Sequence, residues 1–203
     1  MFPTPVYTVA LPDGPALSAA LRDVVLRRGA EQRGVSRSNV GGWQSEIDML
    51  RWGGEPAEAL AQIVTRACTQ MTALADDASA APIWRPEMWA NINRSGDSNQ
   101  NHWHPGSFLS FVYYVDDGYA GSADPALGGE LVFVDPRMPF LRMRTPHLRH
   151  RAGNGSVEEQ ETWVRPFSGL LIGFPSFLGH SVRPYHGTGT RISIAINMIA
   201  RAI

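Results

Sequence analysis

Residues 101–115 read NHWHPGSFLSFVYYV, and the two histidines near the start of this stretch, His102 and His104, stand two positions apart. In an extended chain alternate side chains project to the same face, so both imidazoles can approach one metal ion. The residues that follow, 108–115, are rich in aromatic and β-branched side chains, which is typical of a strand. The stretch therefore predicts a pair of metal ligands within a β-rich fold.

Two later segments complement this pair. A predicted strand at 169–174 (GLLIGF) leads into a loop that carries His180, and a further strand begins at Arg191. Two histidines at strand spacing and a distant third are the donor types of a transition-metal site. An arginine grips a carboxylate through two parallel hydrogen bonds. These residues favour a non-haem iron site with a carboxylate clamp over a β-sandwich module in which the histidines are only structural.

The last predicted strand, 191–198 (RISIAINM), alternates strictly between two kinds of side chain. One face carries polar or small residues: Arg191, Ser193, Ala195 and Asn197. The other face carries three isoleucines and a methionine, which suit a core. A polar face of this composition predicts that the strand lines a cavity. Arg191 with Ser193 beside it can bind the remote carboxylate of a dicarboxylate.

Composition limits the classes of function. The chain has 203 residues, of which 43% are hydrophobic and 18% charged, as in an ordinary globular domain, and we expect one domain over 1–203. A net charge of −1 without a basic cluster argues against a nucleic-acid partner. All 18 basic residues are arginine, which excludes Schiff-base catalysis by lysine, and the single cysteine, Cys68, excludes a disulfide framework.

We also expect a cytoplasmic protein that is not bound to a membrane. No apolar run is long enough to cross a bilayer, and the first residues, MFPTPVYTVALPDGP, lack the layout of a signal peptide. The sequence leaves open whether the chain forms a homodimer.

Helical signals dominate the first part of the chain, 1–82. Asp13 as N-cap and Pro15 in the first turn predict a helix that Gly29 ends. A second helix is predicted from the apolar residues that recur at helical spacing between Leu60 and Leu74. We expect these helices to cover a sheet.

From residue 83 to 203 the pattern changes to short strands separated by long loops. Helices followed by many short strands predict a mainly β fold, a jelly roll (double-stranded β-helix, cupin-like) that the N-terminal helices buttress. The segment 136–157 has little periodicity and is expected to be an excursion between strands. Three further histidines, expected to be solvated, do not fit the metal geometry: His147, His150 and His186.

Taken together, these motifs resemble the 2-oxoglutarate- and iron(II)-dependent oxygenases over roughly residues 89–199. The pattern is HxH at 102–104, then GGELVF, then PxxGxLIxFPSxxxHxVxP with its histidine at 180, then RxS from Arg191. It is most similar to an oxygenase group that carries an HxHP-x-S segment before a YYV strand. The GGEL strand and the eleven-residue spacing from His180 to Arg191 also resemble the prolyl-hydroxylase-like branch.

The resemblance implies iron(II), 2-oxoglutarate and O2 as cofactor and co-substrates. It implies His102, His104 and His180 as catalytic iron ligands, and Arg191 with Ser193 as the site of the distal carboxylate. Tyr114 and Asn197 are further co-substrate candidates. The candidates for substrate contact are Trp43, Gln44, Trp89 and Asn91. The expected reaction is hydroxylation of a small-molecule or carrier-tethered substrate, although desaturation, epoxidation and halogenation would use the same residues.

One departure from the family pattern leaves alternatives open. The commonest ligand set has a carboxylate where this chain has His104. We favour a three-histidine site; the other alignment takes His104-Pro105-Gly106 as a His-x-Gly motif with His180 as the only other protein ligand. The alternative function is a cupin-like metal-binding protein, an isomerase or a sensor, without oxygenase activity.

Overall fold

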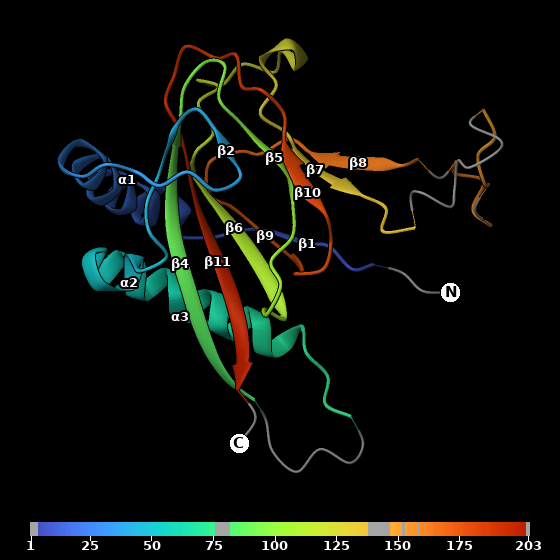
Figure 1. Cartoon of the computed structure of the whole chain (residues 1–203), viewed down its shortest axis with the longest axis horizontal. Coiled ribbons are helices and arrows are strands. Elements are labelled where there is room, and N and C mark those ends of the chain that lie inside the picture. The colour runs from blue at the N-terminus through green and yellow to red at the C-terminus, as the bar shows by residue number, and fades with distance from the viewer. Residues whose placement is uncertain (1–3, 76–81, 138–146, 152, 158, 202–203) are drawn as a thin grey trace.

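Two antiparallel sheets lie face to face, and the two long helices pack on the outer face of the larger sheet (Figure 1). The computed structural model describes residues 4–75, 82–137, 147–151, 153–157 and 159–201. The arrangement is the jelly roll predicted from the sequence, with N-terminal helices as the buttress. No helix in the described ranges is long and apolar enough to span a membrane.

The larger sheet has six strands in the order β1-β9-β6-β11-β4-β3. Their bounds are β1 Tyr7–Ala10, β3 Trp43–Gln44, β4 Ile83–Asn93, β6 Leu109–Asp116, β9 Leu170–Pro175 and β11 Arg191–Arg201. The smaller sheet has the order β2-β5-β10-β7-β8. Its strands are β2 Asn39–Val40, β5 Ser98–His102, β7 Leu131–Val134, β8 Glu161–Val164 and β10 His180–Val182. The helices are α1 Gly14–Glu31, α2 Met49–Trp52 and α3 Gly54–Gln70, with a 3-10 turn at Pro125–Leu127.

Helix α1 begins as predicted but does not end at Gly29. Asp13 is its N-cap residue, although the carboxylate makes no capping hydrogen bond, and Pro15 lies in the first turn. A Cβ atom on Gly29 would lie 2.7 Å from Cδ1 of Ile92 and 3.6 Å from the ring of Trp43. The prediction of a helix end was wrong because this glycine serves the close approach of the helix to the sheet, and the helix continues past it.

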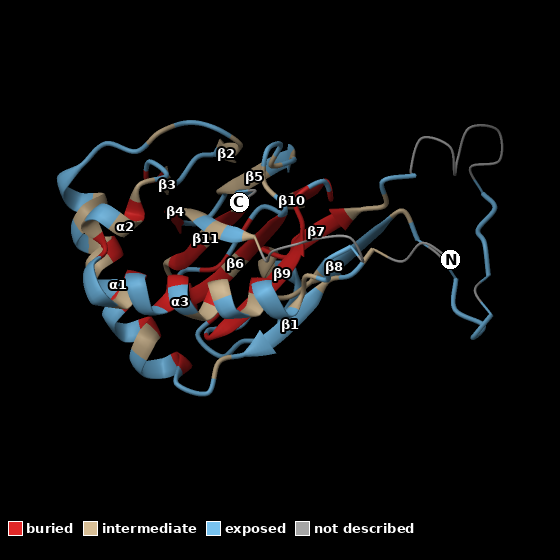
Figure 2. Cartoon of the chain, turned by 90° about the horizontal axis from the view of Figure 1, so that it is seen from below, coloured by how far each residue is buried: buried red, intermediate tan, exposed pale blue. Residues whose placement is uncertain are grey.

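Helix α3 buries the apolar stripe that the sequence predicted. Leu60, Val64 and Cys68 are fully buried against the larger sheet (Figure 2). The helix ends at Gln70, so Leu74 lies beyond it and is exposed, contrary to the prediction. Burial raises the pKa of the Cys68 thiol to about 12, so this cysteine is a protonated core residue, as expected.

Strand β11 is the central strand on which the site depends, because it pairs with β4 along its whole length and with β6 on its other side. Its apolar face is buried in the core shared with the helices, through Ile192, Ile194, Ile196 and Met198. Its polar face is turned to the space between the sheets, through Arg191, Ser193, Ala195 and Asn197. The two faces predicted from the alternation are confirmed.

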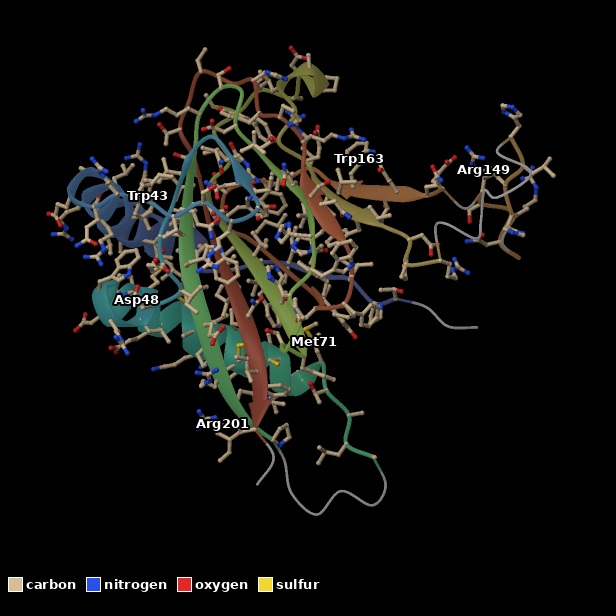
Figure 3. All side chains as sticks on the ribbon, in the orientation of Figure 1. Trp43, Asp48, Met71, Arg149, Trp163 and Arg201 are labelled. Carbon is tan, nitrogen blue, oxygen red and sulfur yellow. The ribbon has the colours of Figure 1, made fainter. Side chains whose placement is uncertain are left out.

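The excursion between β7 and β8 was also predicted, and its described residues extend away from the sandwich (Figures 1 and 2). His147 and His150 are exposed there, as expected. Arg149 marks this segment in Figure 3. Residues 138–146, 152 and 158 of the excursion lie outside the described part of the chain.

Candidate metal centre

Three histidines converge between the two sheets. His102 ends β5 and His180 opens β10, where the structure pairs them directly; His180 therefore lies at a strand end and not in the predicted loop. His104 follows β5 by two residues. One ring nitrogen from each histidine falls within 4.8 Å of the others, and no other such group of three occurs in the described ranges. Nε2 of His104 lies 3.2 Å from Nε2 of His180.

Backbone carbonyls orient two of these rings. Nδ1 of His102 lies 2.7 Å from the carbonyl oxygen of Gln100, and Nδ1 of His180 lies 2.9 Å from that of Leu178. A carbonyl oxygen only accepts, so Nδ1 is the protonated nitrogen in both rings. The lone pair of a neutral imidazole is then on Nε2. Hydrogen bonds of this kind fix the tautomer and orientation of metal-binding histidines.

The environment keeps the imidazoles neutral. Burial, with the nearby His102, lowers the pKa of His104 to about 4 and that of His180 to about 3. Burial also lowers the pKa of His102, although its hydrogen bond to the Gln100 carbonyl acts in the opposite direction and raises the pKa. At neutral pH the cluster therefore carries the unprotonated form that a divalent metal ion requires.

A buried arginine lies at the other end of the same space. Arg191 is 1% exposed; its Nη1 donates to Oδ1 of Asn93 at 3.2 Å and its Nη2 to the carbonyl of Gly129 at 3.3 Å. Its Nε has no hydrogen-bond partner in the described part of the chain, and neither has the hydroxyl of Tyr114, whose ring centre lies 5.1 Å from the guanidinium carbon. Burial raises the pKa of Tyr114, so the hydroxyl stays protonated. Two unpaired buried donors, one on the guanidinium and one on the adjacent tyrosine, are suited to an anion.

A cavity of about 480 Å³ joins the histidines to Arg191. Most residues singled out from the sequence line it: Tyr114, Ser193 and Asn197 among the co-substrate candidates, and Gln44, Trp89 and Asn91 among the substrate candidates. Trp43 is not brought to this cavity. Its indole N–H donates to the carbonyl of Gln32 at 2.9 Å, and the residue lies beside α1 (Figure 3).

Sequence reasoning missed several residues of the site, among them Arg37, Ser38 and Asn93. Arg37 and Ser38 line the cavity from the segment before β2, and Oγ of Ser38 lies 3.4 Å from Nε2 of His102. Asn93, which binds Arg191, lies on the same face of β4 as Trp89 and Asn91. The alternation of side chains along this strand could have identified it. Nothing local marks Arg37 or Ser38, because their place depends on the pairing of β2 with β5. His186 is exposed and does not line the cavity.

A jelly roll with imidazoles and a buried arginine in one cavity is the architecture expected of a non-haem iron oxygenase. The family model described as "Putative 2OG-Fe(II) oxygenase" matches residues 87–197, more than half of the chain. The chain therefore belongs to the 2-oxoglutarate- and iron(II)-dependent oxygenases, as the sequence motifs predicted. Iron(II), 2-oxoglutarate and O2 are the cofactor and co-substrates of this family.

Solved structures of similar fold include two prolyl hydroxylases. The Pseudomonas putida prolyl-4-hydroxylase is 20% identical, with a TM-score of 0.63 over 98% of this chain and 94% of that chain. The Trichoplax adhaerens prolyl hydroxylase, in complex with a hypoxia-inducible-factor peptide fragment, is 15% identical, with a TM-score of 0.67 over 96% and 83%. HygX from Streptomyces hygroscopicus, with nickel and 2-oxoglutarate bound, is 13% identical, with a TM-score of 0.60 over 96% and 82%. These likenesses establish the fold. No curated protein sequence matches the chain.

Proposed function

We propose that this oxygenase hydroxylates a small-molecule or carrier-tethered substrate, with His102, His104 and His180 as the iron ligands. The observation that carries the proposal is the approach of three imidazole nitrogens to within 4.8 Å of one another in a cavity that also reaches a buried arginine. Neutral imidazole is a donor that iron(II) accepts. When bound, iron(II) with 2-oxoglutarate supplies the activation of O2, coupled to decarboxylation of 2-oxoglutarate to succinate and carbon dioxide.

Arg191 binds the distal carboxylate of 2-oxoglutarate in this proposal. Its unpartnered Nε and the unpartnered hydroxyl of Tyr114 are buried donors, and Ser193 pairs with Tyr114 across the strands. Leu131 and Val182 pair with each other two residues along the strands from His180 and line the cavity. Their apolar side chains suit the methylene groups of the co-substrate. A 2-oxoglutarate oxygenase needs such a buried cation with free donors and a cupin-like isomerase or sensor does not, which favours the oxygenase over the cupin-like alternative.

The substrate is bound by the remaining part of the cavity, toward β3 and β4. Trp89 offers an aromatic wall next to the metal centre, since its ring centre lies 5.6 Å from that of His104. Gln44 and Asn91 are paired across these strands and offer amide donors and acceptors. These residues orient the substrate and exclude water from it. A cavity of about 480 Å³ suits a small molecule or the end of a tethered chain.

The test is an anaerobic titration of the protein with iron(II) and 2-oxoglutarate, followed by the weak visible charge-transfer absorption of the chelate. We expect the band in the wild type and its loss in His102→Ala, with His150→Ala, an exposed histidine, as the matched control. A band that survives unchanged in His102→Ala would favour the His-x-Gly alignment. No band in the wild type, together with no O2-dependent succinate formation, would refute the proposal.

A further inference from the structure

The charge of the cavity points to the class of substrate. In the described part of the chain no aspartate or glutamate lines the cavity, and its charged lining residues are Arg191 at the inner end and Arg37 at the mouth. We propose that the substrate is a small organic anion whose acidic group binds Arg37. This inference rests on the function proposed above and narrows its substrate class.

Counting charges shows why an anion is favoured. Iron(II) brings two positive charges and 2-oxoglutarate brings two negative ones. His104 occupies the position where the commonest ligand set has a carboxylate, so the three ligands contribute no negative charge. The charges of iron(II) and 2-oxoglutarate cancel, so the charges of Arg191 and Arg37 leave the loaded cavity with a net positive charge. Positive potential in a cleft with low-dielectric walls attracts anions and opposes cations.

Carboxylates near this space are already used elsewhere or lie outside it. Glu130 is buried but pairs with Arg165, at 3.5 Å between Nη1 and Oε1, and does not line the cavity. Asp97 accepts the backbone N–H of Arg94 at 2.6 Å and is also not a lining residue. Among the described residues no carboxylate pairs with the guanidinium of Arg37, which remains available to a ligand.

The backbone of Arg37 is held in place at the mouth. Its N–H donates to Oδ1 of Asn39 at 2.8 Å, and the next residue, Ser38, accepts the N–H of Gln100 on β5 at 2.8 Å. The segment is therefore attached to the strand that ends in His102. A guanidinium on an attached backbone loses less freedom when it binds an anion than one on a free loop.

The lining of the cavity suits the rest of such a molecule. Amide side chains that can donate to an anion line the same cavity as Arg37: Gln44, Asn91, Asn99, Gln100 and Asn101. Ile47, Trp89 and Trp103 provide apolar surface for the organic part. An amine would meet amide oxygens but no carboxylate, so its charge would be poorly compensated.

The experiment uses three fluorinated probes of similar size and different charge: 4-fluorophenylacetate, 4-fluorophenylacetamide and 4-fluorophenethylamine. The protein is loaded with cobalt(II) and excess 2-oxoglutarate, and the broadening of each fluorine NMR line by the paramagnetic ion is titrated, with the zinc(II) protein as the diamagnetic control. We expect the acid to bind more tightly than the amide and the amine to bind least. An equal response to acid and amide, or a preference for the amine, overturns the inference.

A pair of variants separates Arg37 from charge in general. Arg37→Gln should lower the affinity for 4-fluorophenylacetate by about fivefold, the upper range for an exposed charge pair. The affinity for 4-fluorophenylacetamide should stay unchanged. Arg33→Gln removes the same charge four residues away, outside the cavity lining. It should change neither the affinity for the acid nor that for the amide. Unchanged binding of the acid in Arg37→Gln overturns the inference while the metal centre stands. Failure of cobalt(II) to give histidine-dependent absorption refutes the metal centre itself, and the inference falls with it.

Discussion

Nε2 of His104 lies 3.2 Å from Nε2 of His180, although 76 residues separate the two histidines in the chain. Two nitrogen ligands of one divalent ion, each about 2.1 Å from it, lie about 3 Å apart when they subtend a right angle. The observed separation thus fits two adjacent ligand positions. Nδ1 of His180 donates to the carbonyl of Leu178, so Nε2 of this ring presents its lone pair at one of these positions.

We expect His180→Ala to lower metal affinity by at least about 100-fold, the upper range for loss of a group that supports a metal site. Turnover of 2-oxoglutarate should fall below detection, because His180 is one of the three protein donors proposed for the metal. The measurement is a cobalt(II) or iron(II) titration by absorption. His186→Ala, an exposed histidine outside the cavity, should bind metal as the wild type does. Equal affinity in the two variants would remove His180 from the ligand set.

Arg191→Gln should weaken 2-oxoglutarate binding by about 30-fold or more, because loss of one partner of a buried charge pair costs about 2–5 kcal/mol. The metal affinity in the absence of 2-oxoglutarate should stay unchanged. Arg201→Gln is the matched control, since Arg201 lies at the opposite, exposed end of β11 (Figure 3). Retained 2-oxoglutarate affinity in Arg191→Gln would contradict the role proposed for this arginine.

The sequence was most informative where a strand alternates strictly. The period of two on β11 separated the residues of the cavity from those of the core, and the structure confirms every assignment from Arg191 to Met198. The spacing of His102 and His104 also predicted that both imidazoles reach one site, which the structure places beside His180. Alternation and spacing are local, so they can be read without knowing which strands pair.

Residues whose place depends on pairing could not be found in this way. Trp43 and Gln44 form a two-residue strand, and their register with β4 sets Trp43 opposite Ile92 and Gln44 opposite Asn91. A shift of one residue would exchange the two faces. The sequence named both as substrate candidates, but only Gln44 reaches the cavity. Ser38 was missed for the same reason, since it depends on the long-range pairing of β2 with β5.

The two faces of β11 provide a direct test with neighbouring residues. Ile194→Ala should destabilise the protein by about 3 kcal/mol, within the range for truncation of a buried isoleucine, because Ile194 is fully buried in the core. Its affinity for 2-oxoglutarate should change little. Ser193→Ala should do the reverse, with weaker 2-oxoglutarate binding and a change in stability below about 1 kcal/mol. Urea unfolding measures the stability of both variants, and titration with 2-oxoglutarate measures their affinity. If both variants lost the same property, the assignment of the two faces would be contradicted.

The metal-free protein should lose stability on acidification, because burial holds the pKa of His180 at about 3 in the folded chain. An unfolded histidine has a pKa of about 6.5. Between these two values the unfolded state binds a proton that the folded state does not, so the free energy of unfolding falls as the pH is lowered. The loss is about 1.4 kcal/mol for each pH unit below 6.5, or about 2 kcal/mol at pH 5.

Urea unfolding at pH 7.5 and pH 5.0 measures this loss, and His180→Gln isolates the contribution of one imidazole. Glutamine does not titrate, so the variant should lose about 2 kcal/mol less than the wild type between the two pH values. The stability present above pH 6.5 should be unaffected by further alkalisation, since both states are then unprotonated at this residue. An equal pH dependence in wild type and variant would mean that His180 is accessible to protons in the folded chain, which is incompatible with a ring buried against His102 and His104.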